Sequence, residues 1–175
     1  DVADMNWLIL GSAVHLILEN AQEESEQLKE NKIIIPLKNG YKLSGIFDLY
    51  DDKIKTVTDY KNTSVNKYLY NDWEEYRNQV LIYCWMLQQI GFEARRGEII
   101  AMFRDWSQNK AKADPEGYPQ SPIYKIGWAF RNDDFNEIEI FIDNKFESIQ
   151  VCELLPDELL PACTPEERWH EDMQS

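Results

Sequence analysis

The sequence predicts an α/β fold in which a mixed β-sheet is flanked by helices. Segments with apolar residues at helical spacing alternate with short runs rich in β-branched and aromatic residues. Three of the strand-like runs follow one another directly, each separated from the next by a turn, and a long helix and a further strand come after them. A helix before such a meander and another after it would cover a sheet, which is the arrangement of an α/β sandwich.

The first part of the chain supplies a helix and the three-stranded meander. Trp7, Val14 and Leu18 recur at helical spacing. Asn39-Gly40 between two apolar runs is typical of a tight hairpin turn. The polar segment after the meander is either a plain loop or a loop that lies over a substrate. The predicted elements are a helix at 5–30, strands at 32–37, 41–50 and 53–61, and this loop at 62–70.

The rest of the chain alternates helices with strands. Asn71 or Asp72 is predicted to cap the clearest helix, and Gly91 to end it. A later helix is predicted to begin at Asp133-Asp134, and the prolines of the tail favour an extended ending. The predicted elements are a helix at 71–90, a strand at 96–106, a loop at 107–122, a strand at 124–131, a helix from 133 to 149 and the tail.

Composition indicates one globular domain. The chain has 175 residues, of which 43% are hydrophobic, and this is enough for a real core. No stretch approaches the roughly 20 apolar residues of a membrane span, so no membrane partner is expected. No signal peptide is recognisable, and the chain opens inside a predicted helix, so we expect a piece of a longer chain. The three cysteines are scattered, which argues against a disulfide framework and favours a reducing, intracellular setting.

The net charge of −14 is unevenly spread along the chain. Residues 1–30 hold 7 acids and 1 base, and residues 133–175 hold 13 acids and 2 bases, whereas residues 31–132 hold 12 acids and 15 bases. The middle of the chain is therefore mildly basic although the whole chain is acidic. Net charge then neither supports nor excludes a nucleic-acid phosphate backbone as a partner.

The strongest candidate site lies in the second hairpin, from Gly45 to Lys61. Side chains at i and i+2 of a strand share a face, so Asp59 and Lys61 project together, with the backbone carbonyl of Tyr60 between them. Asp48 can join them from the neighbouring strand. Two carboxylates, a carbonyl oxygen and an ammonium group at one spot suit a hard divalent cation and a polyanionic substrate.

The alternative interpretation of this hairpin is a surface hairpin with solvated charges. Most single charges on strands are of that kind, and the charges of the turn between the strands fit it. Asp48 and Asp59 fit it less well because they lie inside apolar runs. A carboxylate directed toward a core costs several kcal/mol, so it needs a cation or hydrogen bonds nearby.

Two predicted helices each carry a polar pair on one face. His15 and Glu19 are four residues apart in the first helix, and Gly11 lies one turn before them. Gln79 and Tyr83 have the same spacing in the helix after the meander. Taken alone, each pair is equally compatible with an ordinary surface or core position.

Taken in chain order, these residues form four motifs: Gly-x-x-x-His-x-x-x-Glu (11–19), Gly-x-x-Asp (45–48), Asp-x-Lys (59–61) and Gln-x-x-x-Tyr (79–83). The sequence thereby resembles the PD-(D/E)XK nuclease superfamily, and within it the RecB-like exonucleases and their phage-encoded relatives. The resemblance implies a restriction-endonuclease-like core: a helix, a three-stranded meander, a helix and a strand in a mixed sheet. It covers a core at about 8–106 of a single nuclease domain at 1–175, with a strand and helix extension at about 123–175.

The resemblance also implies roles for particular residues. The acids of the hairpin would bind the metal, the lysine would orient the attacking water and stabilise charge on the phosphate, and the Gln-x-x-x-Tyr motif would brace the site and the DNA backbone. The implied metal residues are Asp48, Asp59, Tyr60 through its carbonyl, His15 beside the metal, and Glu19 through water; the implied catalytic residues are Lys61, Asp48, Asp59, Gln79 and Tyr83.

The function that follows is a Mg²⁺- or Mn²⁺-dependent DNA exonuclease of phage or bacterial recombination and repair, in the cytoplasm of a bacterial or phage-infected cell. Because the chain lacks helicase motifs, any helicase or recombination partner would be a separate protein. RecB-type nucleases with an iron–sulfur cluster use four cysteines, so three cysteines predict no iron–sulfur cluster here. The alternatives are a non-catalytic nuclease-fold module that binds DNA or a protein, and an endonuclease of the same fold.

Overall fold

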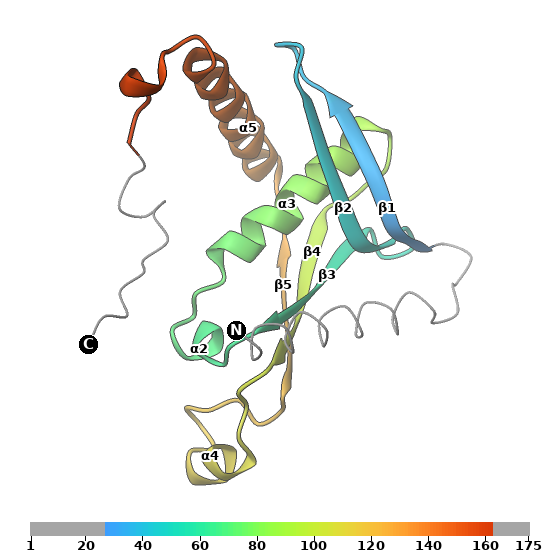
Figure 1. Cartoon of the computed structure of the whole chain (residues 1–175). Helices are drawn as coiled ribbons and strands as arrows, with labels where there is room; N and C mark the ends of the chain where they lie inside the picture. Colours follow the sequence, from blue (N-terminus) through green and yellow to red (C-terminus); the bar gives the residue numbers. More distant parts are fainter. Residues whose placement is uncertain (1–26, 163–175) are drawn as a thin grey trace.

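The computed structural model describes residues 27–162, and they form a five-stranded sheet with helices packed on it (Figure 1). The strands lie side by side in chain order, and only β3 and β4 are parallel; the other neighbours are antiparallel. The strands are β1 (Gln27–Pro36), β2 (Lys42–Asp51), β3 (Thr56–Thr63), β4 (Arg96–Phe103) and β5 (Ile123–Ala129). The predicted mixed sheet with its three-stranded meander is confirmed.

Helices cover the sheet and connect its strands. Parallel strands need a crossover connection, and the long helix between β3 and β4 supplies it. The helices are α2 (Asn66–Leu69), α3 (Glu74–Gln89), α4 (Gln108–Ala113) and α5 (Asn132–Cys152), followed by the short 3₁₀ helix η1 (Asp157–Leu159). None of the helices in the described part of the chain is long and apolar enough to cross a membrane.

One face of the sheet lies against α3, and two glycines allow the close approach. A Cβ on Gly97 of β4 would lie 2.4 Å from Val80 Cγ2 in α3, and one on Gly45 of β2 would lie 2.9 Å from Tyr83 Cε1. Alternation along β4 then directs Ile99 and Ala101 toward α3 as well, and both are fully buried. The apolar core of the protein lies in this layer.

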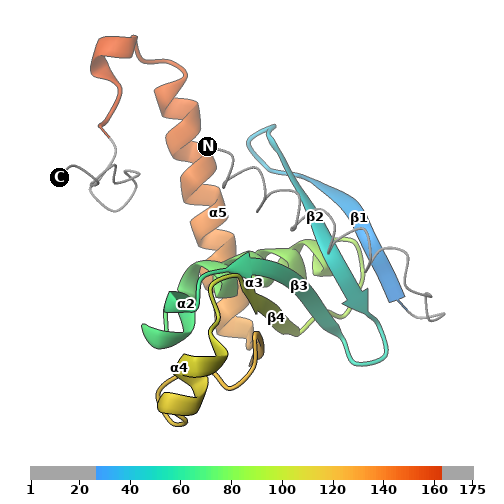
Figure 2. The ribbon, with the colours of Figure 1, turned by 60° about the horizontal axis from the view of Figure 1, so that its bottom comes forward.

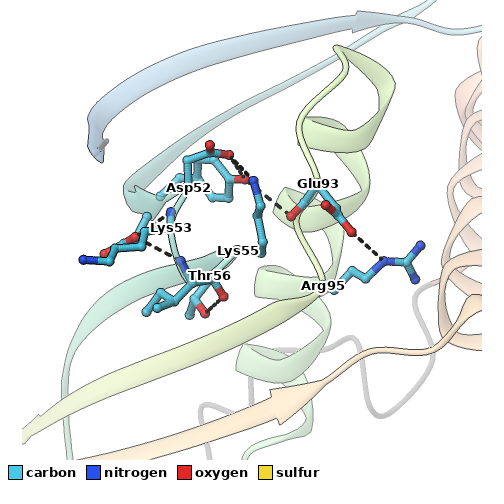
Figure 3. A network of polar contacts seen from close by, with 9 residues as sticks. Asp52, Lys53, Lys55, Thr56, Glu93 and Arg95 are labelled. Carbon is cyan, nitrogen blue, oxygen red and sulfur yellow. Dashed lines mark hydrogen bonds and ion pairs between the residues drawn. The ribbon is translucent and has the colours of Figure 1, made fainter. Parts of the chain in front are cut away.

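A network of polar contacts closes the turn between β2 and β3 (Figure 3). Asp51 Oδ1 accepts hydrogen bonds from the backbone N–H groups of Lys53 and Ile54, which suits an aspartate at a turn. Asp52 accepts from Tyr50 Oη at 2.8 Å and pairs with Lys55 at 2.9 Å. The turn therefore includes residues 53–55, and the strand predicted at 53–61 begins only at Thr56.

The same hairpin opens at its other end. β2 pairs with β3 only from Leu49↔Thr58 to Asp51↔Thr56, whereas β3 pairs with β4 along its whole length. β2 continues instead with β1, from Gln27↔Asp51 to Pro36↔Lys42. Figures 1 and 2 show this β1–β2 arm turning away from β3. A gap in the hydrogen-bond ladder therefore begins next to Asp48 and Asp59.

The structure corrects the end of the first predicted helix. Residues 27–30 belong to β1 and not to a helix, and Gln27, Leu28 and Lys29 pair with the last residues of β2. The Gln-Leu-Lys-Glu segment has helix-forming residues, but the long-range pairing overrides this local preference. The remainder of that predicted helix, with Gly11, His15 and Glu19, lies outside the described residues.

The start of α3 also differs from the prediction. Neither Asn71 nor Asp72 caps the helix: Asn71 has a positive φ of 51°, and the Asp72 carboxylate binds Lys67. The helix begins after Trp73, which makes no side-chain cap. Gly91 ends the turn after α3 with a φ of 95°, as predicted.

Both segments predicted as loops contain a short helix. Residues 62–70 include α2, and residues 107–122 include α4, which Ser107 caps by accepting a hydrogen bond from Lys110 N. Trp106 Nε1 donates to the carbonyl of Pro119 at 2.7 Å and closes the second segment. The strand predicted at 96–106 ends at Phe103, three residues before this tryptophan.

Candidate functional site

Strand β3 brings Asp59 and Lys61 into contact, as their i, i+2 spacing predicts. Lys61 Nζ lies 2.8 Å from Asp59 Oδ2. The Asp59 side chain is only 5% exposed and that of Lys61 is 23% exposed. The pair therefore has its carboxylate in the interior and its ammonium group at the edge of solvent.

Both side chains lie on the face of the sheet that α3 covers. The parallel register places Asp59 beside Ile99 and Lys61 beside Ala101 in β4, and those residues face α3. Charges surrounded by apolar neighbours interact more strongly than charges in water. The ion pair is thus part of the boundary between the core and solvent and not a surface feature, which answers the alternative of a solvated hairpin.

Asp48 reaches this pair from β2. The register of the hairpin, continued by one step, would place Asp48 opposite Asp59, but the strand pairing ends at Leu49↔Thr58. At that point Asp48 Oδ2 accepts a hydrogen bond of 2.7 Å from the backbone N–H of Tyr60. A side chain therefore makes the contact to β3 at the point where strand pairing has ended, and it fixes the second carboxylate next to the first.

The backbone carbonyl of Tyr60 faces the same gap. The N–H and C=O groups of one strand residue point toward the same neighbouring strand. Because the Tyr60 N–H points to Asp48, its carbonyl oxygen is directed to the β2 side as well. Two carboxylates and one carbonyl oxygen thus converge where β2 leaves β3.

Gln79 and Tyr83 contact each other on α3, which covers the face of the sheet that carries Asp59 and Lys61. Gln79 Nε2 donates a hydrogen bond of 3.0 Å to Tyr83 Oη. Burial raises the pKa of the Tyr83 phenol; the hydrogen bond from Gln79 and the charge of Lys61 oppose the rise, and the carboxylates of Asp59 and Asp48 reinforce it. Tyr83 is therefore a neutral phenol that lies within electrostatic reach of both acids and the lysine.

Two features of this region are visible only in the structure. The missing side chain of Gly45 lets Tyr83 of α3 approach β2, so this glycine of the Gly-x-x-Asp motif has a packing role. Tyr76, predicted only as part of the apolar stripe of α3, places its ring 5.4 Å from Lys61 Nζ in a cation–π contact. In the sequence, Tyr76 lies one helical turn before Val80 and so belongs to the apolar stripe. Such a position indicates burial, but it does not indicate contact with Lys61.

The donor set fits a hard divalent cation in part. Carboxylate and carbonyl oxygens are the ligands that Mg²⁺ and Mn²⁺ prefer. Asp48, Asp59 and the Tyr60 carbonyl supply three such oxygens, and water commonly completes the shell of Mg²⁺. Residues 27–162 contain no group of three or more His, Cys, Asp or Glu side chains that could hold a metal. His15 and Glu19, the other predicted metal residues, lie outside the described residues.

Comparison with known proteins points to one family. The family model of the PD-(D/E)XK nuclease superfamily matches residues 17–164, which is most of the chain. Members of that superfamily generally use divalent metals. No curated protein matches the chain.

A solved structure that matches the chain shares its fold. It is titled "Crystal structure of SSO0001", is 19% identical, and superposes with a TM-score of 0.53 over 80% of this chain. The match spans 60% of the length of that protein, so the chain corresponds to only part of it. At this identity the likeness supports the fold alone, and it agrees with the restriction-endonuclease-like sheet described above.

Proposed function

Because the chain belongs to the PD-(D/E)XK nuclease superfamily, we propose that it is a divalent-metal-dependent deoxyribonuclease and, more narrowly, a RecB-like exonuclease of phage or bacterial DNA recombination and repair. The nuclease part rests on the family and the site. The exonuclease part rests on the Gly-x-x-x-His-x-x-x-Glu and Gln-x-x-x-Tyr motifs of the sequence.

The convergence of Asp48, Asp59 and Lys61 carries the proposal. Asp59 touches Lys61, and Asp48 binds the backbone of the residue between them. An acidic pair without the lysine would suit metal storage, and a lysine without the acids would suit simple phosphate binding. Together they suit the hydrolysis of a phosphodiester, which requires an activated water and relief of negative charge on the phosphate.

Each part of the site has a chemical role in this reaction. Asp48, Asp59 and the Tyr60 carbonyl would hold Mg²⁺ or Mn²⁺, which supplies Lewis acidity for the attacking water and the phosphate. Lys61 Nζ, held in place by Asp59, offers hydrogen-bond donors to a phosphate oxygen and neutralises charge there. The Tyr83 hydroxyl, positioned by Gln79, is a neutral donor beside the same phosphate.

Nuclease activity and metal binding can be tested with one pair of matched variants. Asp59→Asn removes a charge without changing shape, and Glu98→Gln removes a partly buried carboxylate from the opposite face of the sheet. We expect wild type and Glu98→Gln to bind Mn²⁺ in calorimetry and to degrade linear DNA. Asp59→Asn should lose the Mn²⁺ heat and at least ~100-fold in rate, because a metal ligand is removed. Wild-type protein that degrades no DNA with Mg²⁺ or Mn²⁺ would refute the proposal.

Exonuclease activity has its own test. An exonuclease needs a DNA end, so it should degrade a linear duplex or a linear single strand and leave covalently closed circles intact. Cleavage of the circles at a similar rate would assign the chain to the endonucleases of the same fold. Metal binding without any cleavage would favour the non-catalytic module instead.

A further inference from the structure

A second lysine, Lys67 in α2, lies beside the proposed catalytic lysine. Its Nζ is 4.9 Å from the centre of the Tyr76 ring, and Lys61 Nζ is 5.4 Å from the centre of the same ring. One aromatic ring therefore contacts both ammonium groups. Since each lies within the ~6 Å range of a cation–π contact, the two cations are within about 10 Å of one another.

The ring that joins the two lysines is held at the end of β3. Tyr76 Oη donates a long hydrogen bond of 3.4 Å to Thr63 Oγ1, and Thr63 is the last residue of β3. In Figure 1, α2 lies between the end of that strand and the start of α3. Lys67 and Lys61 thus approach Tyr76 from two consecutive elements of the chain.

The helix that carries Lys67 is anchored at its beginning. Asp105, just after β4, accepts hydrogen bonds of 2.7 Å from both Ser64 Oγ and Val65 N. Burial would raise the pKa of Asp105, but these hydrogen bonds outweigh it and keep the pKa below its usual value. The carboxylate therefore remains an ionised acceptor, which is suited to holding the start of α2 in place.

Lys67 forms ion pairs with carboxylates that are mostly exposed to solvent. Its Nζ is 2.8 Å from Asp72 Oδ2 and 3.8 Å from Glu75 Oε2. The Lys67 side chain is 21% exposed, whereas those of Asp72 and Glu75 are 61% and 79% exposed. Ion pairs with such exposed partners contribute little, so a phosphate can replace these carboxylates at small cost. Lys67 would remain cationic when it changes partners.

We infer that Lys67 binds a second phosphate of the DNA strand whose scissile phosphate faces Lys61, exchanging its pair with Asp72 for the DNA backbone. The inference rests on the proposed function for the identity of the substrate. Contacts of this kind fix the register of a protein on DNA without reading its sequence. Lys67 would thereby add to the affinity for the strand without touching the scissile phosphate.

Salt dependence of DNA binding tests the contact directly. The probe is a fluorescein-labelled short duplex with single-stranded ends, bound in EDTA so that no cleavage occurs. Lys67→Gln should reduce the magnitude of the slope of log affinity against log salt concentration by about 1 for duplex DNA. Lys67→Arg should restore the slope. The matched control is Lys125→Gln, another ion-paired lysine, on the opposite face of the sheet, which should leave the slope unchanged.

Freeing the lysine from its carboxylate gives the complementary measurement. Asp72→Asn should tighten binding of the same probe about threefold or more, and this gain should vanish in the Lys67→Gln background, since the two residues are coupled. Glu98→Gln frees Lys125 in the same way and should give no comparable gain. A slope that Lys67→Gln leaves unchanged, or additive effects of Asp72→Asn and Lys67→Gln, would overturn the inference.

The outcomes separate this inference from the proposed function. If wild type cleaves DNA but Lys67→Gln binds and cleaves like wild type, the nuclease proposal stands and the Lys67 contact is refuted. If the slope changes as expected but wild type never cleaves, Lys67 binds DNA in a non-catalytic module and the nuclease proposal fails. With both correct, Lys67→Gln should raise KM several-fold and change kcat by less than about twofold, because uniform binding is lost.

Discussion

Two lysine–carboxylate pairs in the same sheet have nearly the same length and very different surroundings. Lys61 Nζ is 2.8 Å from Asp59 Oδ2, and Lys125 Nζ is 2.7 Å from Glu98 Oε2. The first pair lies under α3, with its carboxylate 5% exposed. The second lies on the opposite face, with its lysine 60% and its carboxylate 23% exposed. The distance alone therefore does not distinguish a site from a surface pair.

The two pairs differ in the groups that surround them. The Asp59–Lys61 pair has a second carboxylate, a carbonyl oxygen directed into the gap between strands, and two tyrosines of α3 within reach. The Glu98–Lys125 pair lies beside Gly127 of β5, where a Cβ would be 3.1 Å from Glu98 Cγ. Burial makes the first pair costly to form and sensitive to change, whereas an exposed pair is close to neutral.

The largest expected difference between the pairs is catalytic. Lys61→Met keeps most of the side-chain stem but removes the donor that faces the phosphate, so the DNA cleavage rate should fall about 100- to 1000-fold. Lys125→Met should change the rate less than about twofold. Both rates are measured on linear DNA with Mg²⁺, with thermal unfolding as the control for folding. Equal losses in the two variants would remove the functional distinction between the pairs.

Alanine substitutions at the glycines near the two pairs should lower the free energy of unfolding by different amounts. Alanine at Gly45 would place its Cβ 2.9 Å from Tyr83 Cε1 and 3.2 Å from Met86 Sδ, inside a packed layer. We expect the free energy of unfolding in urea to fall by about 1–3 kcal/mol, as for other overpacked cores. Alanine at Gly127 would meet the flexible Glu98 Cγ at 3.1 Å and should cost less. A greater loss at Gly127 than at Gly45 would contradict this account.

A third ion pair, between Arg77 of α3 and Asp134 of α5, sharpens the comparison because it joins two helices and has no place in the site. The backbone N–H of Arg131 lowers the pKa of Asp134; partial burial opposes this, and the hydrogen bond and charge of Arg77 add to it. A folded-state pKa below the unfolded value stabilises the protein above the unfolded pKa, and this stabilisation is lost as the pH falls through the folded pKa.

Asp134→Asn should therefore lower the free energy of unfolding by about 1 kcal/mol at pH 7, in the range of a lost helix cap. The difference from wild type should shrink below pH ~4, the unfolded pKa of aspartate. Urea unfolding across this pH range gives the measurement, and DNA cleavage at pH 7 should change little. Asp133→Asn, an exposed aspartate in the same turn, is the control. A stability difference that persists undiminished at low pH would show that the Asp134 charge is not its source.

Local chemistry made much of this protein predictable. The Asn39-Gly40 turn, the helix that ends at Gly91 and the shared face of Asp59 and Lys61 all follow from short-range rules. The mixed sheet followed from the order of the elements. The four motifs in order identified the family, although no single motif would have done so.

Features that depend on distant parts of the chain were not predictable in the same way. Gln27 to Lys29 are in β1 because they pair with Leu49 to Asp51 of β2, although the local sequence there favours helix. Asn71 and Asp72 are residue types that often cap a helix, but the Asp72 carboxylate accepts a hydrogen bond from Lys67 instead. The separation of β2 from β3 at Asp48 is a matter of strand twist and pairing, which hydrophobic pattern does not encode. Tyr76 occupies a stripe position whose contact with two lysines depends on where β3 and α2 place them.

The opening between β2 and β3 has a mechanical consequence. Asp48 belongs to the β1–β2 arm, whereas Asp59 and Lys61 belong to β3, and β2 pairs with β3 at three residue pairs only, from Leu49↔Thr58 to Asp51↔Thr56. The two acids therefore lie on opposite sides of the opening between β2 and β3. A cation bound by both acids would cross-link the two strands. Metal binding would therefore make the β1–β2 arm more rigid, and bending of the arm would weaken metal binding.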